Sequence, residues 1–214
     1  MERFVFLHGL GQTPDDWDEV LRNLDDMGEF FCPDLTKMCG SPADYRDLYR
    51  NASNLCWDLA DDPEHLPNIV GLSLGGILAL SFAEEHPDKI GSLAVIGAQY
   101  KTPKKLLKFQ SLLFRFAPQQ AFEDLGFSRE DFLSLCRSMA GLDLSYGLEN
   151  ISCPTLIAVG KEDAPNRKAA REMYESITQA RYCEIGTADH EVNKEAPERL
   201  AKLLTRFYKA EKII

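Results

Sequence analysis

The sequence predicts an α/β fold in which a doubly wound, mostly parallel sheet of about six strands is covered by helices on both faces. Two observations carry this prediction. Short apolar runs alternate along the chain with longer stretches whose apolar residues recur at helical spacing. Several of the short runs are continuously apolar, which is typical of strands that are buried on both faces. The expected strands are Phe4–Leu7, Phe30–Pro33, Asn68–Gly71, Ser92–Ile96, Thr155–Gly160 and Arg181–Ile185.

Four helices are predicted between and after these strands. After Pro42, apolar residues recur three and four positions apart from Tyr45 to Leu59, which indicates one buried helix face. The second helix is expected to stop before Pro87. The expected helices are Tyr45–Leu59, Leu74–Glu85, Asn166–Thr178 and Pro197–Lys209.

The segment from Tyr100 to Asn150 interrupts this alternation, because it is far longer than one crossover needs. It contains two or three helical patterns, and one of them begins with Ser128 as N-cap ahead of Phe132 and Leu135. We therefore expect residues 1–214 to form a single domain, with residues 100–150 as a helical lid or cap insertion within it. The expected place of this insertion is over the carboxyl ends of the strands, where open parallel sheets bind ligands.

Composition argues against several classes of function. The 214 residues are 44% hydrophobic and carry a net charge of −10, which disfavours nucleic acid or an anionic membrane surface as the main partner. No apolar stretch is long enough to span a bilayer. The N-terminus runs directly into a strand-like segment without a cleavage site, so we expect a cytoplasmic protein.

Six cysteines are present, at positions 32, 39, 56, 136, 153 and 183. No two of them are closer than seven positions, so the spacing fits neither a zinc site nor a thioredoxin-like motif. We expect free thiols that pack as small apolar side chains.

The motif Gly71-Leu72-Ser73-Leu74-Gly75 lies between a predicted strand and a predicted helix. A serine in this position sits on a strained turn that presents its hydroxyl above the sheet. Gly71 and Gly75 supply the small neighbours that such a turn needs. This motif predicts a nucleophilic serine. The competing interpretation is a glycine-rich turn in which the serine only caps the helix.

A second turn, His8-Gly9-Leu10-Gly11, follows the first expected strand. Acyl transfer builds negative charge on a carbonyl oxygen, and two fixed N–H donors must meet that charge. The residue after the nucleophile, Leu74, is expected to supply one donor of this oxyanion hole and Leu10 the other. An ordinary turn with a structural histidine is the competing interpretation of His8.

A nucleophilic serine needs a base, and the base needs an orienting acid. Of four histidines, only His190 follows a late strand in a loop at the carboxyl edge. The acid is expected after a strand between nucleophile and base, where Asp163 is the first choice and Glu162 the reserve. The order Ser73, Asp163, His190 agrees with the serine-acid-histidine order of one fold.

These residues resemble the α/β-hydrolase superfamily, whose serine hydrolases carry a Ser-Asp-His triad. Further similarity lies in Phe31-Cys32-Pro33-Asp34-Leu35 and in the spacing of His190, Glu195 and Pro197. The resemblance implies that Ser73 is the nucleophile, Asp163 the acid, His190 the base, and Leu10 with Leu74 the oxyanion donors.

The chain departs from the superfamily pattern in three places. It starts at what resembles the third family strand, so the N-terminal hairpin is expected to be missing. The run Thr36-Lys37-Met38-Cys39-Gly40 replaces the usual loop after the second strand. Asp189 stands where glycine is common; it either raises the pKa of His190, or competes with Asp163, or is a solvated loop residue.

The expected reaction is hydrolysis of a carboxylic ester or thioester through an acyl-serine, without a metal or organic cofactor. Two alternatives stay open: a lyase similar to the menaquinone-pathway synthases that eliminate pyruvate with the same triad, and a non-catalytic small-molecule-binding member. The expected partner is a small-molecule ester or thioester. The sequence does not choose between monomer and dimer. One basic run either attracts an anionic substrate or forms a solvated face; it contains Lys101, Lys104, Lys105, Lys108 and Arg115.

Overall fold

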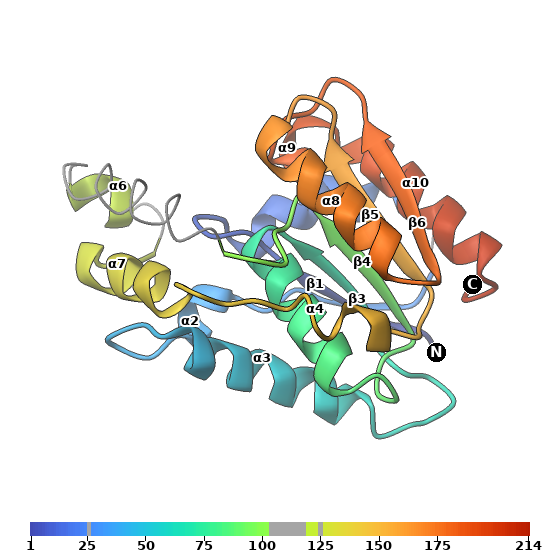
Figure 1. Ribbon diagram of the computed structural model, residues 1–214, viewed down its shortest axis with the longest axis horizontal. Coiled ribbons are helices and arrows are strands. Elements are labelled where there is room, and N and C mark those ends of the chain that lie inside the picture. The colour runs from blue at the N-terminus through green and yellow to red at the C-terminus, as the bar shows by residue number, and fades with distance from the viewer. Residues whose placement is uncertain (25–26, 103–118, 124–125) are drawn as a thin grey trace.

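A computed structural model describes residues 1–24, 27–102, 119–123 and 126–214 of the chain (Figure 1). The described residues contain one six-stranded sheet, in the order β2-β1-β3-β4-β5-β6. Every neighbouring pair in it is parallel. The predicted fold class is confirmed. The strands are β1 (Arg3–Leu7), β2 (Glu29–Phe31), β3 (Asn68–Leu72), β4 (Ser92–Ile96), β5 (Thr155–Gly160) and β6 (Ala180–Ile185).

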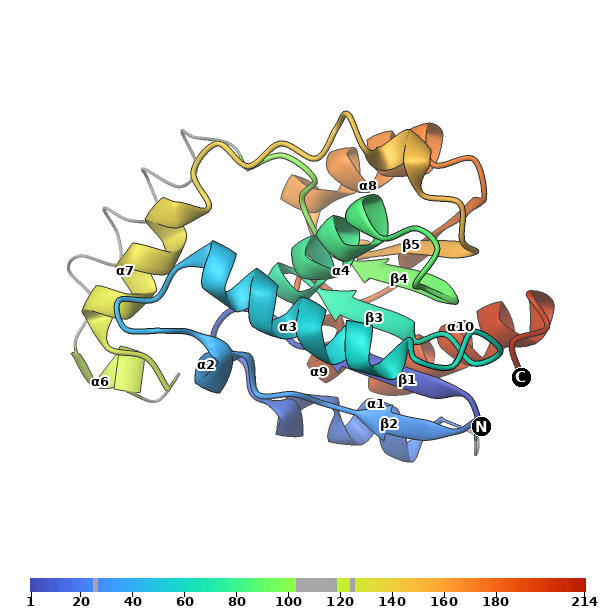
Figure 2. The same cartoon turned by 90° about the horizontal axis from the view of Figure 1, so that it is seen from below.

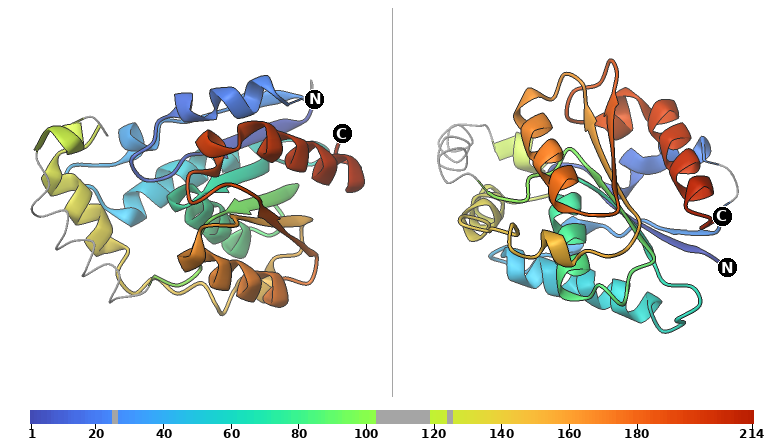
Figure 3. Two further views of the ribbon diagram at one scale, coloured as in Figure 1. Left: turned by 90° about the horizontal axis from the view of Figure 1, so that it is seen from above. Right: turned by 45° about the vertical axis from the view of Figure 1, so that its right-hand side comes forward.

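Alternate residues of the central strands pack into two separate apolar cores, one on each face of the sheet. Val5 and Ile69 point into the core beneath α3 (Tyr45–Leu59), α4 (Leu74–Glu85) and α8 (Ala164–Ser176). Phe4 and Val70 point into the other core, beneath α1 (Asp18–Arg22) and α10 (Pro197–Ala210). Figures 1 and 3 show these two helical layers on opposite sides of the strands. Since both faces are covered, the strands are apolar throughout, as the sequence indicated.

The four predicted helices are all present. α3 begins at Tyr45 and is capped by Asp44, whose side chain accepts a hydrogen bond from the backbone N–H of Arg46. α4 is buried along most of its length and ends at Glu85, with His86 as its C-cap just before Pro87. α8 begins at Ala164, two residues earlier than expected, because Asp163 caps it and Pro165 fits its first turn.

Shorter elements were not predicted. They have too few residues to show a period, and their capping residues also suit ordinary turns. The expected strand Phe30–Pro33 is also shorter than predicted: β2 ends at Phe31, and Asp34 caps a short helix where a loop was expected. The unpredicted elements are η1 (Pro14–Trp17), α1, α2 (Leu35–Met38), α6 (Gln119–Glu123), η2 (Leu148–Asn150) and α9 (Val192–Glu195).

The predicted insertion contains α6 and α7 (Arg129–Ser138) within the described residues. Ser128 caps α7 as expected, accepting a hydrogen bond from the N–H of Asp131. The Asp131 carboxylate in turn accepts from the N–H of Ala43, which fixes α7 beside the start of α3. In Figure 2 the arrows of β3 and β4 point toward the side on which α6 and α7 lie.

Most of the basic run lies outside the described residues: Lys104, Lys105, Lys108 and Arg115 all do. Lys101 is described, and its ammonium lies 3.6 Å from the carboxylate of Asp143. All six cysteines are free thiols. Burial raises the pKa of Cys56 to about 12, so this thiol is inert at neutral pH.

Within the described part of the chain, no helix combines the length and the apolar character that crossing a membrane requires.

Candidate active site

Ser73 occupies the sharp turn between β3 and α4. Its backbone has φ 54° and ψ −112°, a conformation that residues other than glycine rarely adopt. The Ser73 N–H donates to the carbonyl of Ile96 on the neighbouring strand β4, at 2.9 Å, which holds the turn against the sheet. Such strain persists only where surrounding structure fixes it, and it marks Ser73 as a candidate functional residue.

The two glycines of the motif are required by close backbone approaches. A Cβ atom added to Gly71 would lie 2.3 Å from the carbonyl oxygen of Gly75. A Cβ added to Gly75 would lie 2.1 Å from the carbonyl oxygen of Leu7 on β1. No side chain fits at either distance, so the spacing of the glycines around Ser73 is a steric requirement of the turn.

The chain brings His190 and Asp163 to this serine from distant positions in the sequence. His190 Nε2 lies 2.9 Å from Ser73 Oγ, and His190 Nδ1 lies 2.9 Å from Asp163 Oδ2. Asp163 follows β5 and His190 follows β6, so both lie at the carboxyl edge of the sheet, as does Ser73. The three predicted catalytic side chains therefore form one continuous hydrogen-bonded chain.

Asp163, and not Glu162, contacts the histidine. The Asp163 side chain is 3% exposed, whereas Glu162 points into solvent. Burial raises the pKa of Asp163, but hydrogen bonds from His190 and Asn166 outweigh it and hold that pKa below the ordinary value. Asp163 is therefore ionised at neutral pH and able to orient a proton on His190 Nδ1.

The pKa of His190 lies above its ordinary value of 6.5. The hydrogen bond to Asp163 is the main cause; burial opposes it, and the charges of Asp163, Glu191 and Asp189 add to it. Asp189 makes the smallest of these contributions, and its side chain is exposed. Asp189 therefore raises the pKa of His190, as one of the interpretations from the sequence proposed, while the hydrogen bond to the ring comes from Asp163.

Two amide side chains that the sequence did not suggest support the acid. Asn166 Nδ2 lies 2.8 Å from both carboxylate oxygens of Asp163, and Gln99 Nε2 donates to Asn166 Oδ1 at 2.6 Å. Asn166 Nδ2 also lies 3.1 Å from His190 Nδ1. That nitrogen carries a proton when His190 donates to Asp163, so it has no lone pair for Asn166. The sequence does contain one signal for this contact: Asn166 follows Asp163 by three residues, so a helix that begins between them brings the amide back to the carboxylate.

The turn after β1 lies directly beside the serine. A Cβ on Gly9 would be 3.5 Å from Ser73 Cβ. His8 is buried, and its Nε2 accepts from the N–H of Leu35 at 3.0 Å while Nδ1 lies 2.9 Å from the Gly9 carbonyl. Burial lowers the pKa of His8, which favours the neutral ring that this pair of contacts requires. His8 thus has the structural role that was the competing interpretation, and it anchors the turn that contains Leu10.

The other two histidines lie away from Ser73. His65 contacts Asp62 at 2.8 Å, and His86 ends α4 with its ring against Phe82. Of the four histidines, all of which the structure describes, only His190 therefore contacts Ser73, as the sequence predicted.

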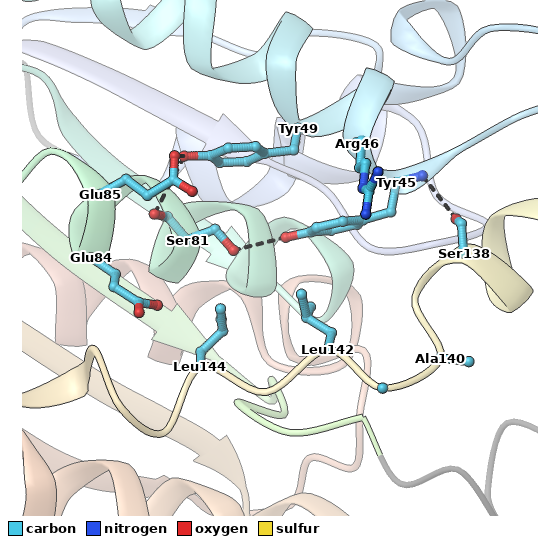
Figure 4. A pocket seen from close by; sticks show the side chains of 11 residues that line it. Tyr45, Arg46, Tyr49, Ser81, Glu84, Glu85, Ser138, Ala140, Leu142 and Leu144 are labelled. Atoms are coloured by element: carbon cyan, nitrogen blue, oxygen red, sulfur yellow. Dashed lines mark hydrogen bonds between the residues drawn. The ribbon is translucent and has the colours of Figure 1, made fainter.

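A separate cavity of about 410 Å³ lies between α3, α4 and the segment after α7 (Figure 4). Its wall includes Tyr45, whose hydroxyl lies 2.8 Å from Ser81 Oγ, and Tyr49, which donates to Glu85 at 2.6 Å. None of Ser73, Asp163 and His190 lines it. This cavity is therefore distinct from the site around the serine.

Comparisons with known proteins identify the family of the chain. The model of the alpha/beta hydrolase family matches residues 4–203. The chain is 26% identical over 253 residues to monoacylglycerol lipase abhd6-A of Xenopus laevis, covering 95% of this chain and 74% of that protein. It is 34% identical over 93 residues to a pimeloyl-[acyl-carrier protein] methyl ester esterase of Aromatoleum aromaticum, covering 44% of this chain and 36% of that protein.

Among solved structures, the enol-lactonase from Burkholderia xenovorans LB400 is similar with a TM-score of 0.82 and 21% identity. The match covers 97% of this chain and 91% of that one. At this identity the similarity shows the shared fold.

Proposed function

The chain belongs to the alpha/beta hydrolase family, and from this premise we propose that it is a serine hydrolase that cleaves carboxylic esters or thioesters through an acyl-serine intermediate. One observation carries the proposal: Ser73 Oγ, His190 and Asp163 are joined by two contacts of 2.9 Å each. A hydroxyl that contacts a base, which in turn contacts an orienting carboxylate, is the arrangement that acyl transfer through serine requires.

In the first half of the proposed reaction, Ser73 Oγ attacks the carbonyl carbon of the ester. His190 Nε2 takes the serine proton as the new C–O bond forms, and Asp163 stabilises the resulting imidazolium. The carbonyl oxygen becomes an oxyanion, for which we propose the backbone N–H groups of Leu10 and Leu74 as donors. Collapse of the intermediate expels the alcohol or thiol, which receives the proton from His190.

The second half repeats these steps with water as the nucleophile. His190 removes a proton from water, the oxygen attacks the acyl carbon, and Ser73 Oγ leaves with the proton that His190 returns. The products are a carboxylic acid and the free enzyme. The whole cycle uses only the protein groups named above and water.

The comparisons support an ester as the substrate class. The named relatives are a monoacylglycerol lipase and a methyl ester esterase, and the similar structure is that of an enol-lactonase. Each of these names describes action on an ester or a lactone, which is a cyclic ester. They support ester hydrolysis more directly than thioester hydrolysis, which we retain because the same triad attacks both carbonyls.

We further propose that the described part of the insertion, residues 100–102, 119–123 and 126–150, forms a lid over this site within a single domain; residues 103–118 and 124–125 of the predicted lid lie outside the described residues. The position of α6 and α7, on the side toward which β3 and β4 point, supports it (Figure 2). The cytoplasmic location stays a prediction, which fractionation of cells that express the protein tests.

The proposal is tested by turnover of matched esters and thioesters of graded acyl length. We expect hydrolysis of one part of the panel and a loss of about 10⁶-fold in kcat for Ser73→Ala. Ser92→Ala is the matched control: this serine is buried at the opposite edge of the sheet, where its hydroxyl donates to Asn68. Its turnover is expected to equal that of the wild type.

Absence of turnover across the panel by well-folded protein would contradict the proposal. Binding of panel compounds without turnover would then favour the non-catalytic alternative, whereas release of pyruvate from a suitable substrate would favour the lyase.

A further inference from the structure

Two buried amide side chains connect the turn after β1 to the loop that carries His190. Gln12 is 2% exposed and Asn193 is fully buried. Gln12 lies in the turn with Gly9 and Leu10, and Asn193 lies in α9, just after His190. Burying two amides is costly unless their donors and acceptors are satisfied, so their partners are informative.

The two amides bond each other in both directions. Gln12 Nε2 donates to Asn193 Oδ1 at 3.1 Å, and Asn193 Nδ2 donates to Gln12 Oε1 at 3.2 Å. The remaining groups reach outward: Gln12 Oε1 accepts from the N–H of Gly9 at 3.1 Å, and Gln12 Nε2 donates to Glu191 at 3.2 Å. Asn193 Nδ2 donates to the carbonyl of Asp16 at 3.1 Å. Each NH₂ group therefore has two acceptors, and each amide oxygen is used.

The surrounding groups fix which end of each amide is oxygen. The Gly9 N–H requires an acceptor, so the Gln12 oxygen must face it. The Asp16 carbonyl requires a donor, so the Asn193 nitrogen must face that. Exchanging oxygen and nitrogen in either side chain would set donors against donors or acceptors against acceptors. The pair therefore has one arrangement, which makes it a specific link between the two loops.

We propose that Gln12 and Asn193 are positioning residues that hold the oxyanion turn and the histidine loop in register for acyl transfer. The proposal rests on the function proposed above. Gln12 makes two hydrogen bonds to Gly9 across the turn: its side-chain oxygen accepts from the Gly9 N–H, and its backbone N–H donates to the Gly9 carbonyl at 3.1 Å. Gly9 lies against Ser73, and the proposed donor Leu10 is the next residue. The amide pair thus sets where the Leu10 N–H lies relative to His190.

Such a link acts on the transition state more than on substrate binding. The oxyanion exists only after Ser73 attacks, and a donor that has moved by a fraction of an ångström meets it poorly. We therefore expect Gln12→Met and Asn193→Leu, each of similar size, to lower kcat by about 10–100-fold. KM is expected to change by less than about threefold, because ground-state contacts are retained.

The experiment measures kcat and KM per active site, with active sites counted by a fluorophosphonate that labels the serine. The affinity of an alkyl boronic acid, which forms a tetrahedral adduct with an active-site serine, is measured beside them. For a positioning role this affinity should fall by about the same factor as kcat. The double variant should lose little more kcat than either single variant, since both break the same link.

Asn68→Leu is the matched control for burial of an amide. Asn68 is 1% exposed at the amino edge of the sheet, accepts from Ser92 Oγ at 2.7 Å, and donates to the carbonyl of Arg3. We expect its midpoint of thermal unfolding to fall while kcat per active site stays at the wild-type value. Asn193→Asp, which keeps the shape of asparagine, replaces Asn193→Leu if that variant does not fold.

If the Gln12 and Asn193 variants lose thermal stability as Asn68→Leu does, but keep wild-type kcat and boronate affinity, the positioning role is overturned and the triad stands. If wild-type protein neither reacts with the fluorophosphonate nor turns over any ester, the proposed function itself fails. The two failures are therefore distinguishable.

Discussion

The two edges of the sheet both bury polar side chains, but they arrange them differently. At the amino edge, the Ser92 hydroxyl donates to the side-chain oxygen of Asn68, and the Asn68 side chain donates to the carbonyl of Arg3. At the carboxyl edge, Ser73 has a strained backbone and the carboxylate of Asp163 is almost fully buried. Stability alone explains the first edge. The second contains strain and buried charge that stability alone would not select, which is typical of a functional site.

Close backbone approach at glycine occurs at both edges, since a Cβ on Gly28, just before β2, would lie 2.2 Å from the carbonyl oxygen of Glu2. Beside Ser73, the backbones at Gly71 and Gly75 lie so close to other backbone segments that there is no space for a Cβ atom. By comparison, a Cβ on Gly40, in the loop before α3, would meet its nearest atom at 3.6 Å. Glycine is therefore required at positions 71 and 75, whereas position 40 has room for a side chain.

The largest expected effect in this comparison comes from Asp163→Asn. The amide cannot hold His190 in the tautomer that accepts the Ser73 proton, so we expect kcat to fall by about 10⁴-fold. Steady-state kinetics on the best ester of the panel measures it. The matched variant Glu162→Gln, at an exposed neighbour, should keep wild-type kcat; a comparable loss in both variants would contradict the assignment of Asp163.

The next effect concerns stability. Gly71→Ala would place a Cβ 2.3 Å from the Gly75 carbonyl oxygen, so the backbone must shift. We expect the free energy of unfolding to fall by about 3 kcal/mol. Gly40→Ala should change it by less than about 0.5 kcal/mol. Urea unfolding of both variants measures the difference, and equal stabilities would show that the turn does not need glycine.

A pH effect of intermediate size follows from the raised pKa of His190. The base must be neutral to accept the serine proton, so kcat/KM falls by about tenfold per pH unit below that pKa. Because Asp163 raises it, the midpoint of this acid limb should lie above 6.5. In Asp163→Asn the midpoint should move to lower pH; a midpoint unchanged by this substitution would mean that another group titrates.

The same shift has a consequence for stability. A histidine whose pKa is raised in the folded state stabilises that state fully at pH below its unfolded value, and this contribution is lost as pH rises through the folded value. Asp163, whose pKa is lowered, contributes stability above its unfolded value that is lost as pH falls through the folded one.

The smallest effect tests the strain at Ser73. Glycine adopts φ 54° and ψ −112° readily, whereas alanine does not. We expect Ser73→Gly to be about 1 kcal/mol more stable than Ser73→Ala, since relief of about 1–3 kcal/mol of strain exceeds the entropy that glycine adds to the unfolded chain. Thermal unfolding of these two inactive variants measures it, and an equal or lower stability for Ser73→Gly would argue against strain.

Much of the site was predictable because its residues follow strands. Ser73, Asp163 and His190 come after β3, β5 and β6, and parallel strands bring their carboxyl ends to one edge. Helix α4 was predicted to the residue because Ser73 begins it and Pro87 follows its end.

What the sequence did not reveal depends on contacts between loops. Asn166, Gln99, Gln12 and Asn193 act through side-chain amides whose partners lie far along the chain. An amide in a loop has no period and no fixed spacing to its partner, so only the folded chain identifies these contacts. The short helices α2 and α9 were missed for a similar reason, since four residues do not show a helical repeat.

The most direct measurement of the central claim is covalent labelling with a fluorophosphonate, followed by mass spectrometry of the digested protein. We predict one phosphonate adduct per chain, located on Ser73, with no labelling of Ser73→Ala and greatly slowed labelling of His190→Ala. An adduct on another residue, or equal labelling of wild type and Ser73→Ala, would contradict the account.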